Sequence, residues 1–273
     1  MARHFFVCAV RPCRFGIAKP RHTGYAHCMT KVRADLLLVS RGLIATRAKA
    51  REAIEAGLVQ SGDRIINKPA ELLDPDCPLK AQLAYHWVSR AGLKLVAALD
   101  AFGVDVTGRQ CLDIGASTGG FTQVLLARGA AHVVAVDVGR DQLDDSLRDD
   151  PRITSLEGQD ARSLTGDHLG DPAPEIVVMD VSFIGIEKIL PSLLAVLPDC
   201  VEVVALVKPQ FQAGPKRVGK RGIVESETAL IIAEEVREHL QGMDGLNIVA
   251  MIESPIAGGD GNREFLLHAK RSR

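Results

Sequence analysis

Short apolar runs alternate with segments of helical spacing over the last two thirds of the chain. Residues 93–102 carry apolar positions three and four apart, which predicts an amphipathic helix. Five strand-like runs follow, most of them separated by helical stretches, at 110–114, 132–137, 153–157, 175–180 and 201–207. Strands and helices that alternate in this way predict a parallel sheet covered by helices on both faces.

The end of the chain departs from this alternation. Strand-like runs at 246–252 and 264–268 are joined by the Gly-rich segment 254–263, which has no room for a helix. Parallel neighbours need a long crossover and antiparallel neighbours do not, so these runs predict an antiparallel hairpin appended to the parallel sheet. The predicted fold class is α/β, with a seven-stranded Rossmann-like sheet.

A smaller pattern precedes this sheet. Residues 36–39 and 45–56 have helical spacing, and Gly57 provides a common helix stop. Strand-like pieces alternate with turn residues from Leu58 to Pro69. We therefore expect a small α+β domain at 31–84, a linker or short strand at 85–90, and the larger domain at 91–273.

The first thirty residues show neither pattern. They contain basic residues and no acidic residue, and Met29 offers a second start directly before the first patterned segment. We interpret residues 1–30 as a disordered or non-native extension. An Arg-rich leader without acidic residues also fits an organelle transit peptide, and the sequence leaves both open.

Composition narrows the class of protein. A hydrophobic content of 47% suffices for a packed core. No apolar run approaches the roughly 20 residues that span a bilayer. The six cysteines form no C-x-x-C pair and have no histidine at zinc spacing, which predicts neither disulfides nor a metal site. We expect a cytoplasmic protein without membrane contact.

The two parts of the chain differ in charge. Residues 1–90 contain 15 Lys+Arg and 7 Asp+Glu, whereas residues 91–273 contain 18 and 27. Lysine and arginine gain affinity for polyanions by displacing counterions from phosphates. The basic front therefore suggests a module that binds nucleic acid, although a solvated surface has the same composition.

A turn of small residues joins the first strand of the sheet to the next helix. Residues 111–122 read CLDIGASTGGFT, and the glycines allow a ligand to approach the backbone at the start of the helix. A dinucleotide site would read G-x-G-x-x-G. This turn instead resembles the D-x-G-x-x-x-G-G motif of S-adenosylmethionine (SAM) enzymes. The resemblance implies SAM as cofactor, bound by Asp113, Gly115, Ser117, Thr118, Gly119, Gly120 and Phe121.

Aspartates at strand ends extend this predicted SAM site. Asp137 ends the second strand, where a carboxylate can accept both ribose hydroxyls. Asp160 follows the third strand, where SAM enzymes usually contact the adenine amino group. Asp180 ends the fourth strand, close to the expected position of the sulfonium. A strand-end aspartate is also a common helix N-cap, so neither Asp137 nor Asp160 is decisive alone.

Lys94, Asp180, Lys208 and Glu264 are the candidate catalytic residues. Asp180 and Lys208 end the fourth and fifth strands, and Glu264 opens the antiparallel last strand. Ligands in such sheets bind beyond the carboxyl ends of the strands, where these three residues should meet. Lys94 comes from the helix before the first strand. Two ordinary salt bridges are the alternative for this set.

These motifs resemble those of known families. Residues 33–69 resemble the S4 RNA-binding domain, through Arg33, Asp35, Gly42, Arg47, Ala50, Ile54, Gly57, Val59, Lys68 and Pro69. The larger domain is similar to the FtsJ-like class I SAM methyltransferases with a Lys-Asp-Lys-Glu tetrad. Together, residues 31–270 resemble the TlyA family, also labelled hemolysins, which methylates cytidine 2′-hydroxyls in ribosomal RNA. The tetrad matches the family segments GLKL, DVSF, VKPQF and GNxEF.

The resemblance implies roles for the tetrad. The ribose hydroxyl is a poor nucleophile until its proton is engaged. We expect Lys208 to accept that proton, Asp180 and Glu264 to orient the lysines, and Lys94 to hold the ribose or a phosphate. The sequence leaves open which of Lys94 and Lys208 handles the proton.

The expected partner is ribosomal RNA or a ribosomal subunit. In the S4-like segment the second helix and following loop imply RNA contacts by Arg41, Arg47, Lys49, Arg51 and Lys68. A basic loop after Lys208 adds Lys216, Arg217, Lys220 and Arg221 as candidates. An ordinary solvated surface accounts equally well for any one of these basic residues. The oligomeric state, the nucleotide and the subunit are not specified.

Three other functions compete with this interpretation. A binding protein without activity would not need the intact glycine turn and tetrad. A membrane-active hemolysin would need a spanning segment or a strongly amphipathic basic helix. A base methyltransferase usually needs a nucleophilic cysteine or an Asn/Asp-Pro-Pro-aromatic loop, which Asp180-Val181-Ser182-Phe183 is not.

Overall fold

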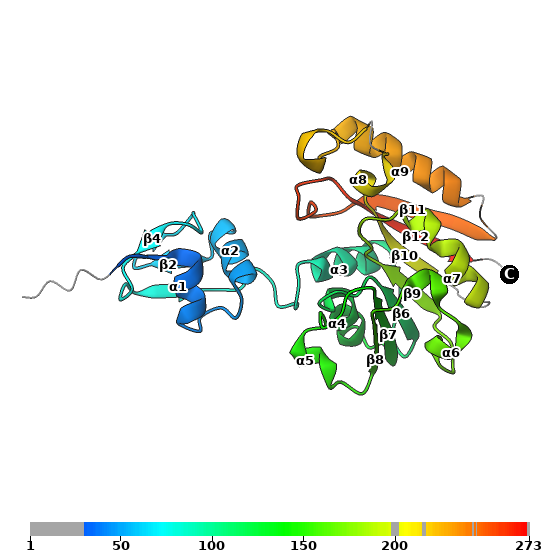
Figure 1. Cartoon of the computed structure of the whole chain (residues 1–273), viewed down its shortest axis with the longest axis horizontal. Helices are drawn as coiled ribbons and strands as arrows, with labels where there is room; N and C mark the ends of the chain where they lie inside the picture. The colour runs from blue at the N-terminus through cyan, green and yellow to red at the C-terminus, as the bar shows by residue number, and fades with distance from the viewer. Residues whose placement is uncertain (1–29, 198–201, 215–216, 242, 244, 272–273) are drawn as a thin grey trace, which may run out of the picture. The chain divides into compact units, whose positions relative to one another are not determined.

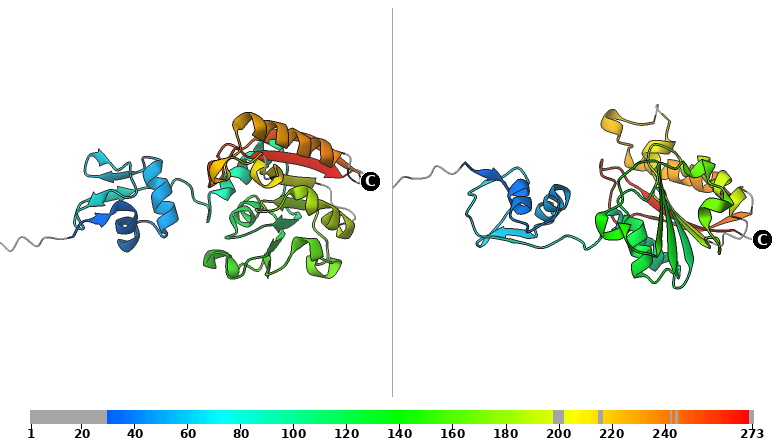
Figure 2. Two further views of the ribbon diagram at one scale, coloured as in Figure 1. Left: turned by 45° about the horizontal axis from the view of Figure 1, so that its top comes forward. Right: turned by 60° about the horizontal axis from the view of Figure 1, so that its bottom comes forward.

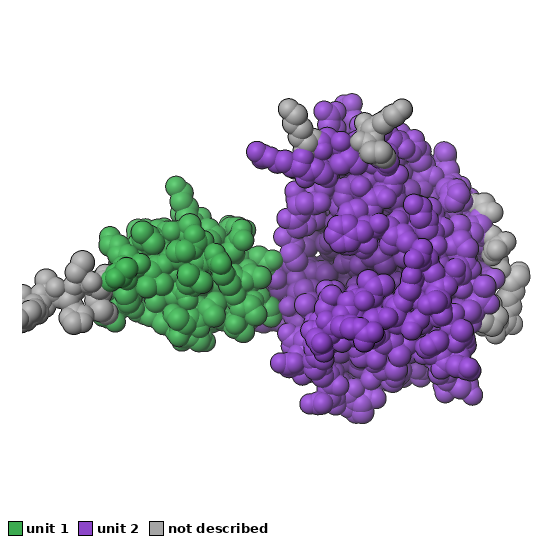
Figure 3. Space-filling model, viewed as in Figure 1, with its two compact units in different colours: residues 1–84 green, residues 85–273 purple. Residues whose placement is uncertain are grey.

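The computed structural model describes residues 30–197, 202–214, 217–241, 243 and 245–271. The chain divides into two compact units, with the boundary between Ala84 and Tyr85 (Figure 3). Apart from Thr30, the interpretation of residues 1–30 as an extension falls outside the described residues.

Unit 1 packs two short helices against short antiparallel strands (Figure 1). Helix α1 spans Ala34–Ser40 and α2 spans Arg47–Glu55; the Thr46 side chain caps α2 by accepting a hydrogen bond from the Lys49 amide. The strands are β1 (Val32–Arg33), β2 (Val59–Ser61), β3 (Arg64–Ile65), β4 (Leu72–Leu73) and β5 (Leu79–Ala81). β1 pairs with β4, and β2 lies between β3 and β5.

Unit 2 is built on one seven-stranded sheet. The strands are β6 (Gln110–Ile114), β7 (His132–Asp137), β8 (Ile153–Glu157), β9 (Ile176–Met179), β10 (Glu202–Val207), β11 (Leu246–Glu253) and β12 (Phe265–Arg271). Their order across the sheet is β11-β12-β10-β9-β6-β7-β8. β6 to β10 run parallel, and β12 is antiparallel to both of its neighbours. The predicted α/β fold class and appended hairpin are confirmed.

Helices cover both faces of this sheet (Figures 1 and 2). Side chains alternate between the faces of a strand, so adjacent apolar residues can enter different cores. Cys111 and Val133 pack with α3 and α4, whereas Leu112 and Val134 pack with α7 and α9. The helices are α3 (Ala91–Phe102), α4 (Gly120–Ala127), α5 (Asp145–Arg148), α6 (Gly166–Leu169), α7 (Leu190–Val196), α8 (Pro209–Gln212) and α9 (Ser226–Gln241), with 3-10 turns η1 (Ala161–Ser163), η2 (Ile186–Lys188) and η3 (Lys220–Gly222).

Element ends differ slightly from those predicted. α3 begins at Ala91, two residues earlier than expected, and β12 runs from Phe265 to Arg271, beyond the predicted end at residue 268. Glu264 therefore lies immediately before the last strand rather than in it. Segment 85–90 contains no helix and no strand, which removes the short-strand alternative.

Candidate active site

The tetrad residues gather at the edge of the sheet where the parallel strands end. Asp180 directly follows β9, and Lys208 directly follows β10. The antiparallel pairing of β10 with β12 sets Val207 opposite Phe265, which makes Lys208 and Glu264 neighbours at this edge. Lys94 lies in the first turn of α3. The fold thus brings together four residues that are up to 170 positions apart.

Each lysine of the tetrad is paired with one carboxylate. Lys94 Nζ lies 2.5 Å from Glu264 Oε2, and both side chains are buried, at 7% and 3% exposed. Lys208 Nζ lies 2.6 Å from Asp180 Oδ1, with 10% and 14% exposed. Removal of one partner would leave an uncompensated charge in a poorly solvated place, which costs about 3–5 kcal/mol in buried pairs.

Two adjoining cavities open beside these pairs. The larger, of about 680 Å³, follows the ends of β6, β7 and β8; the smaller, of about 230 Å³, reaches Lys208. Both are lined by Gly115, Ser117, Asp180 and Ser182. Lys94 is not among the lining residues of either. The larger cavity has room for a nucleoside and the smaller one for a short charged group, so a cofactor with both parts would fit the two together.

Two glycines let the turn after β6 lie close to its neighbours. Gly115 has φ +82°, and an added Cβ would lie 2.6 Å from the carbonyl oxygen of Asp180. A Cβ on Gly120 would lie 2.2 Å from Ser89 Oγ. Ser117 adopts φ +47° and donates its amide to Asp137 Oδ2 at 2.8 Å. The turn is therefore closed tightly against its neighbours and leaves its backbone accessible to a ligand.

Two residues of the predicted turn motif lie away from the cavities. Gly119 lines neither; its missing Cβ makes room for the side chains of Leu143 and Leu147. Asp113 is wholly buried beneath the turn, and Thr122 Oγ1 donates to its Oδ2 at 2.6 Å. Burial raises the pKa of Asp113 to about 7, since the charged form loses its hydration.

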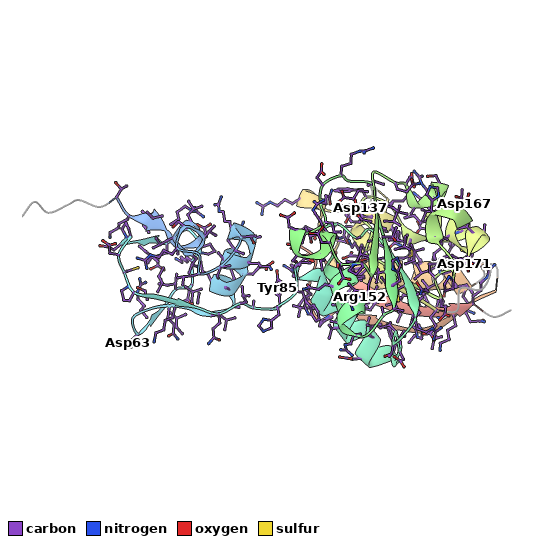
Figure 4. The ribbon with its side chains drawn as sticks, turned by 90° about the horizontal axis from the view of Figure 1, so that it is seen from below. Asp63, Tyr85, Asp137, Arg152, Asp167 and Asp171 are labelled. Carbon is purple, nitrogen blue, oxygen red and sulfur yellow. The ribbon has the colours of Figure 1, made fainter. Side chains whose placement is uncertain are left out.

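Asp137 and Asp160 line the larger cavity, with different partners. Asp137 accepts the amides of Ser117 and Gly139 and marks the end of β7 in Figure 4, at the opposite end of the β7–β8 pair from Arg152. Asp160 caps η1 and forms an ion pair of 2.6 Å with Arg162. The hydrogen bond from Arg162 lowers the pKa of Asp160.

A carboxylate that the sequence did not single out holds the loop after β7. Glu157 Oε1 accepts the amides of Gln142 and Leu143 at 2.8 and 2.9 Å, and its Oε2 accepts the amide of Asp141 at 2.7 Å. These backbone hydrogen bonds lower the pKa of Glu157. Gln142 lines the larger cavity, so Glu157 fixes one of its walls. A glutamate at the end of a strand carries no sequence signal for this role.

An exposed aromatic ring stands at the mouth of the site. Phe183 is 90% exposed, lines the larger cavity and adopts φ +67°, a conformation that costs a non-glycine residue about 1–3 kcal/mol. Its ring centre lies 5.2 Å from that of Phe211. The Phe211 ring centre in turn lies 5.9 Å from Lys208 Nζ. A strained backbone that presents an apolar ring to solvent is typical of a binding position.

Asn262 joins the loop before Glu264 to the loop after Lys208. Its side chain is 1% exposed, accepts the Val224 amide at 2.8 Å and donates to the Gly222 carbonyl at 2.9 Å. It also donates to Asp260 Oδ2 at 2.8 Å. The sequence showed Asn262 as part of a family motif but gave it no role, because its partners Val224 and Gly222 lie 38 and 40 residues away along the chain.

Two of the predicted RNA-binding residues of unit 1 are engaged by hydrogen bonds within that unit. Arg47 Nε donates to Asp35 Oδ2 at 2.9 Å, and Arg33 makes two hydrogen bonds to the same carboxylate. Chiefly through the Arg33 hydrogen bonds, the pKa of Asp35 is lowered to about 2. Arg41 donates to the carbonyls of Pro75 and Cys77. On α2, Arg51 is exposed and Lys49 is half-buried, and Lys68 is exposed in the loop after β3.

The basic loop after Lys208 is described only in part. Lys216 and the side chain of Lys220 fall outside the described residues. Arg217 is engaged within unit 2, because it donates to the Ala213 carbonyl and pairs with Glu235 of α9. Arg221 is exposed, with φ +69°. Of this predicted set, Arg217 and Arg221 both have exposed described side chains, and that of Arg217 is paired with Glu235.

The described part of the chain contains neither a metal site nor a membrane-spanning helix. No cluster of three or more histidine, cysteine, aspartate or glutamate side chains there is arranged to hold a metal ion. Among the described helices, none combines the length and the apolar character needed to cross a membrane.

Known proteins resemble both units. The FtsJ-like methyltransferase model matches residues 87–271, and the S4 domain model matches residues 32–76. The protein named 16S/23S rRNA (cytidine-2'-O)-methyltransferase TlyA of Mycobacterium tuberculosis is 43% identical, over 87% of this chain and 89% of its own. Hemolysin A of Brachyspira hyodysenteriae is 39% identical, over 87% and 99%. A solved structure from Streptococcus thermophilus, provisionally named a hemolysin, is 39% identical with a TM-score of 0.66, covering 89% of this chain and 90% of its own.

The fold, the glycine turn and the family match define a methyltransferase of the FtsJ-like class that also carries an S4 domain. Within this class, the identity over most of both chains shows that the chain belongs to the TlyA family.

Proposed function

We propose that this protein transfers a methyl group from SAM to a ribose 2′-hydroxyl of ribosomal RNA, with cytidine as the target nucleotide. The observation that carries the proposal is the set of two lysine–carboxylate pairs beside a divided cavity. The relative from Campylobacter jejuni named 23S rRNA (cytidine-2'-O)-methyltransferase TlyA, 34% identical over 73% of this chain, supports the same substrate.

The residues around the cavities fit SAM. Asp137 lines the larger cavity and would hold the ribose hydroxyls, with Asp160 and Gln142 on the adenine side. Ser117, Thr118, Gly120 and Phe121 line the smaller cavity and would surround the methionine part. Gly115 lines both, and its missing Cβ leaves the backbone approachable. When bound, SAM supplies a methyl group on a sulfonium, whose positive charge is favoured beside Asp180.

Lys208 is the better candidate for the base. It lines the smaller cavity together with Asp180, whereas Lys94 is 6% exposed and lines neither cavity. A base must come within hydrogen-bond reach of the hydroxyl whose proton it accepts. Lys208 would accept this proton as the ribose oxygen attacks, and Asp180 would stabilise the resulting ammonium. The Lys94–Glu264 pair would support this arrangement from the side of α3.

The surroundings of the site suit an extruded nucleotide. Phe183 presents its ring to solvent at the mouth of the larger cavity and offers a stacking surface for a base. An enzyme that reaches a single ribose in folded RNA gains from such a surface, because the extruded base loses its stacking partners. The basic residues of unit 1 would supply affinity for the surrounding phosphates.

Transfer to RNA tests this proposal directly. The protein is incubated with methyl-labelled SAM and ribosomal subunits, and the RNA is then hydrolysed in alkali. A 2′-O-methyl group blocks hydrolysis of the adjacent bond, so label in a resistant dinucleotide is expected. Label on mononucleotides would identify a base methyltransferase, and no transfer to either subunit or to free RNA would identify a binding protein. Lys208→Ala tests the proposed base. It is expected to lose transfer, while its Kd for SAM changes by at most a few fold.

A further inference from the structure

Lys208 forms an ion pair with Asp180 and, in addition, a hydrogen bond with Ser182. Its Nζ donates to Ser182 Oγ at 3.0 Å, while Asp180 Oδ1 lies 2.6 Å from the same nitrogen. The Lys94 ammonium, by comparison, has Glu264 as its acceptor. The two lysines are therefore held differently, and Ser182 accounts for the difference.

Ser182 is at the junction of the two cavities. It lines both of them, as do Gly115, Ser117 and Asp180, and its side chain is exposed. In the proposed binding mode SAM spans both cavities, so its methyl group leaves from the region that the two cavities share. The hydroxyl of Ser182 is thus within the reacting region and is not part of the packed core.

The backbone around Ser182 is fixed on both sides. The amide of Asp180 donates to the Ile114 carbonyl at 2.9 Å, which ties the segment to β6. The Val181 side chain is 8% exposed and packs in the core, whereas Phe183 turns the chain with φ +67°. Ser182 directly follows an anchored residue and accepts a hydrogen bond from Lys208, so its hydroxyl has a defined position relative to that lysine.

The hydrogen bond to Ser182 restricts the direction of the lone pair of the lysine nitrogen. A neutral amine has two N–H groups and one lone pair, arranged tetrahedrally with the Cε bond. When Ser182 accepts one N–H, rotation about the Cε–Nζ bond is restricted, while the charge of Asp180 keeps the nitrogen close by. Without Ser182, the ion pair would hold the nitrogen in place and leave the direction of its lone pair unset.

We propose that Ser182 is a positioning residue for methyl transfer: its hydroxyl, with Asp180, sets the orientation of Lys208 toward the attacking ribose hydroxyl. This inference rests on the proposed function, in which Lys208 accepts the ribose proton. Ser182 makes no contribution to the binding of SAM in this account. Its effect belongs to the catalytic step.

Ser182→Ala and Ser182→Thr separate this role from a structural one. Both variants are assayed with ribosomal subunits and labelled SAM, and SAM affinity is measured separately by calorimetry. We expect Ser182→Ala to lower kcat about ten- to a hundredfold, as for loss of one hydrogen bond to a charged or reacting group. KM and Kd for SAM stay within about threefold of wild type. Ser182→Thr retains the hydroxyl and restores kcat to within a few fold.

Ser146→Ala is the matched control, because Ser146 is an exposed serine of α5 that lines neither cavity and whose hydroxyl donates to Asp144, the N-cap of that helix. It is expected to behave as wild type. The inference is overturned if Ser182→Ala keeps the wild-type kcat, if its loss falls on SAM affinity, or if Ser182→Thr is as impaired as Ser182→Ala. Absence of transfer by the wild-type protein would instead contradict the proposed function itself.

Discussion

The charged residues of the site act in pairs, and the pairs differ in access. Lys94 and Glu264 are almost fully buried, while Lys208 and Asp180 border a cavity. A buried pair adds little net stability, yet loss of one partner is costly. We therefore infer that Lys94 and Glu264 organise the site, and that Lys208 and Asp180 contact the reactants.

A third carboxylate, Asp35 in unit 1, yields a prediction for pH dependence. The arginines beside it lower its pKa from 3.8 to about 2. A carboxylate with a lowered pKa in the folded state stabilises the protein above its unfolded pKa and loses this contribution as the pH falls toward its folded value. The affected window is therefore about pH 4 to pH 2.

Asp35→Asn should consequently lower the thermal unfolding temperature at pH 6 by several degrees, because Arg33 and Arg47 lose their common acceptor charge. The difference between variant and wild type should shrink below pH 3. Thermal unfolding followed by circular dichroism at both pH values measures this. An equal difference at pH 6 and pH 2.5 would show that the charge of Asp35 is not the cause.

At the scale of elements, the site is held by contacts between loops. Asn262 ties the loop before β12 to the segment 222–224, and Glu157 holds the loop after β7. Both residues satisfy several backbone groups at once. Backbone groups left without a partner in a buried place cost about 1–3 kcal/mol each. These two residues therefore determine the shape of the walls around the tetrad.

Asn262→Ala should loosen the segment 222–224 and raise the KM for ribosomal subunits about tenfold or more, because the neighbouring basic loop loses its fixed position. Kd for SAM should stay within a few fold, since Asn262 does not line the SAM cavities. Hydrogen exchange measures the loosening at the Val224 amide, which Asn262 protects. Wild-type exchange at Val224 together with a raised KM would refute the link between the two.

The sequence predicted strands and their ends well and contacts between loops poorly. Buried parallel strands are continuous apolar runs, so β6 to β10 were visible, and the residues after β9 and β10 followed from them. The position of Gly119 against Leu143 and Leu147 was not foreseen, since a glycine in a turn fits either a ligand or a side chain. The roles of Ser182 and Asn262 depend on partners brought close by folding, and neither residue type indicates such partners.

At the scale of the whole molecule, we expect unit 1 to bind RNA through its basic residues and unit 2 to carry out methyl transfer. On unit 1, Arg51 and Lys68 are exposed and Lys49 is half-buried, and the tetrad and cavities belong to unit 2. Each phosphate contact by a basic residue steepens the dependence of binding on salt. Affinity for ribosomal RNA and chemistry at the ribose should therefore respond to different substitutions.

The double variant Lys49→Ala and Lys68→Ala should weaken binding to ribosomal subunits and reduce the slope of log K against log salt by up to about 1 per lost contact. SAM affinity should not change. Arg237→Ala serves as the control, because Arg237 lies on α9 of unit 2 and pairs with Glu234. Binding and slope equal to wild type in the double variant would exclude α2 and the β3 loop as RNA contacts.

The most direct test of the central claim is the chemical position of the transferred methyl group. Ribosomal subunits are methylated with SAM that carries a deuterated methyl group, the RNA is digested to nucleosides, and the nucleosides are fragmented in a mass spectrometer. We expect cytidine whose ribose fragment carries the deuterium and whose base fragment is unlabelled. Deuterium on the base fragment would contradict it.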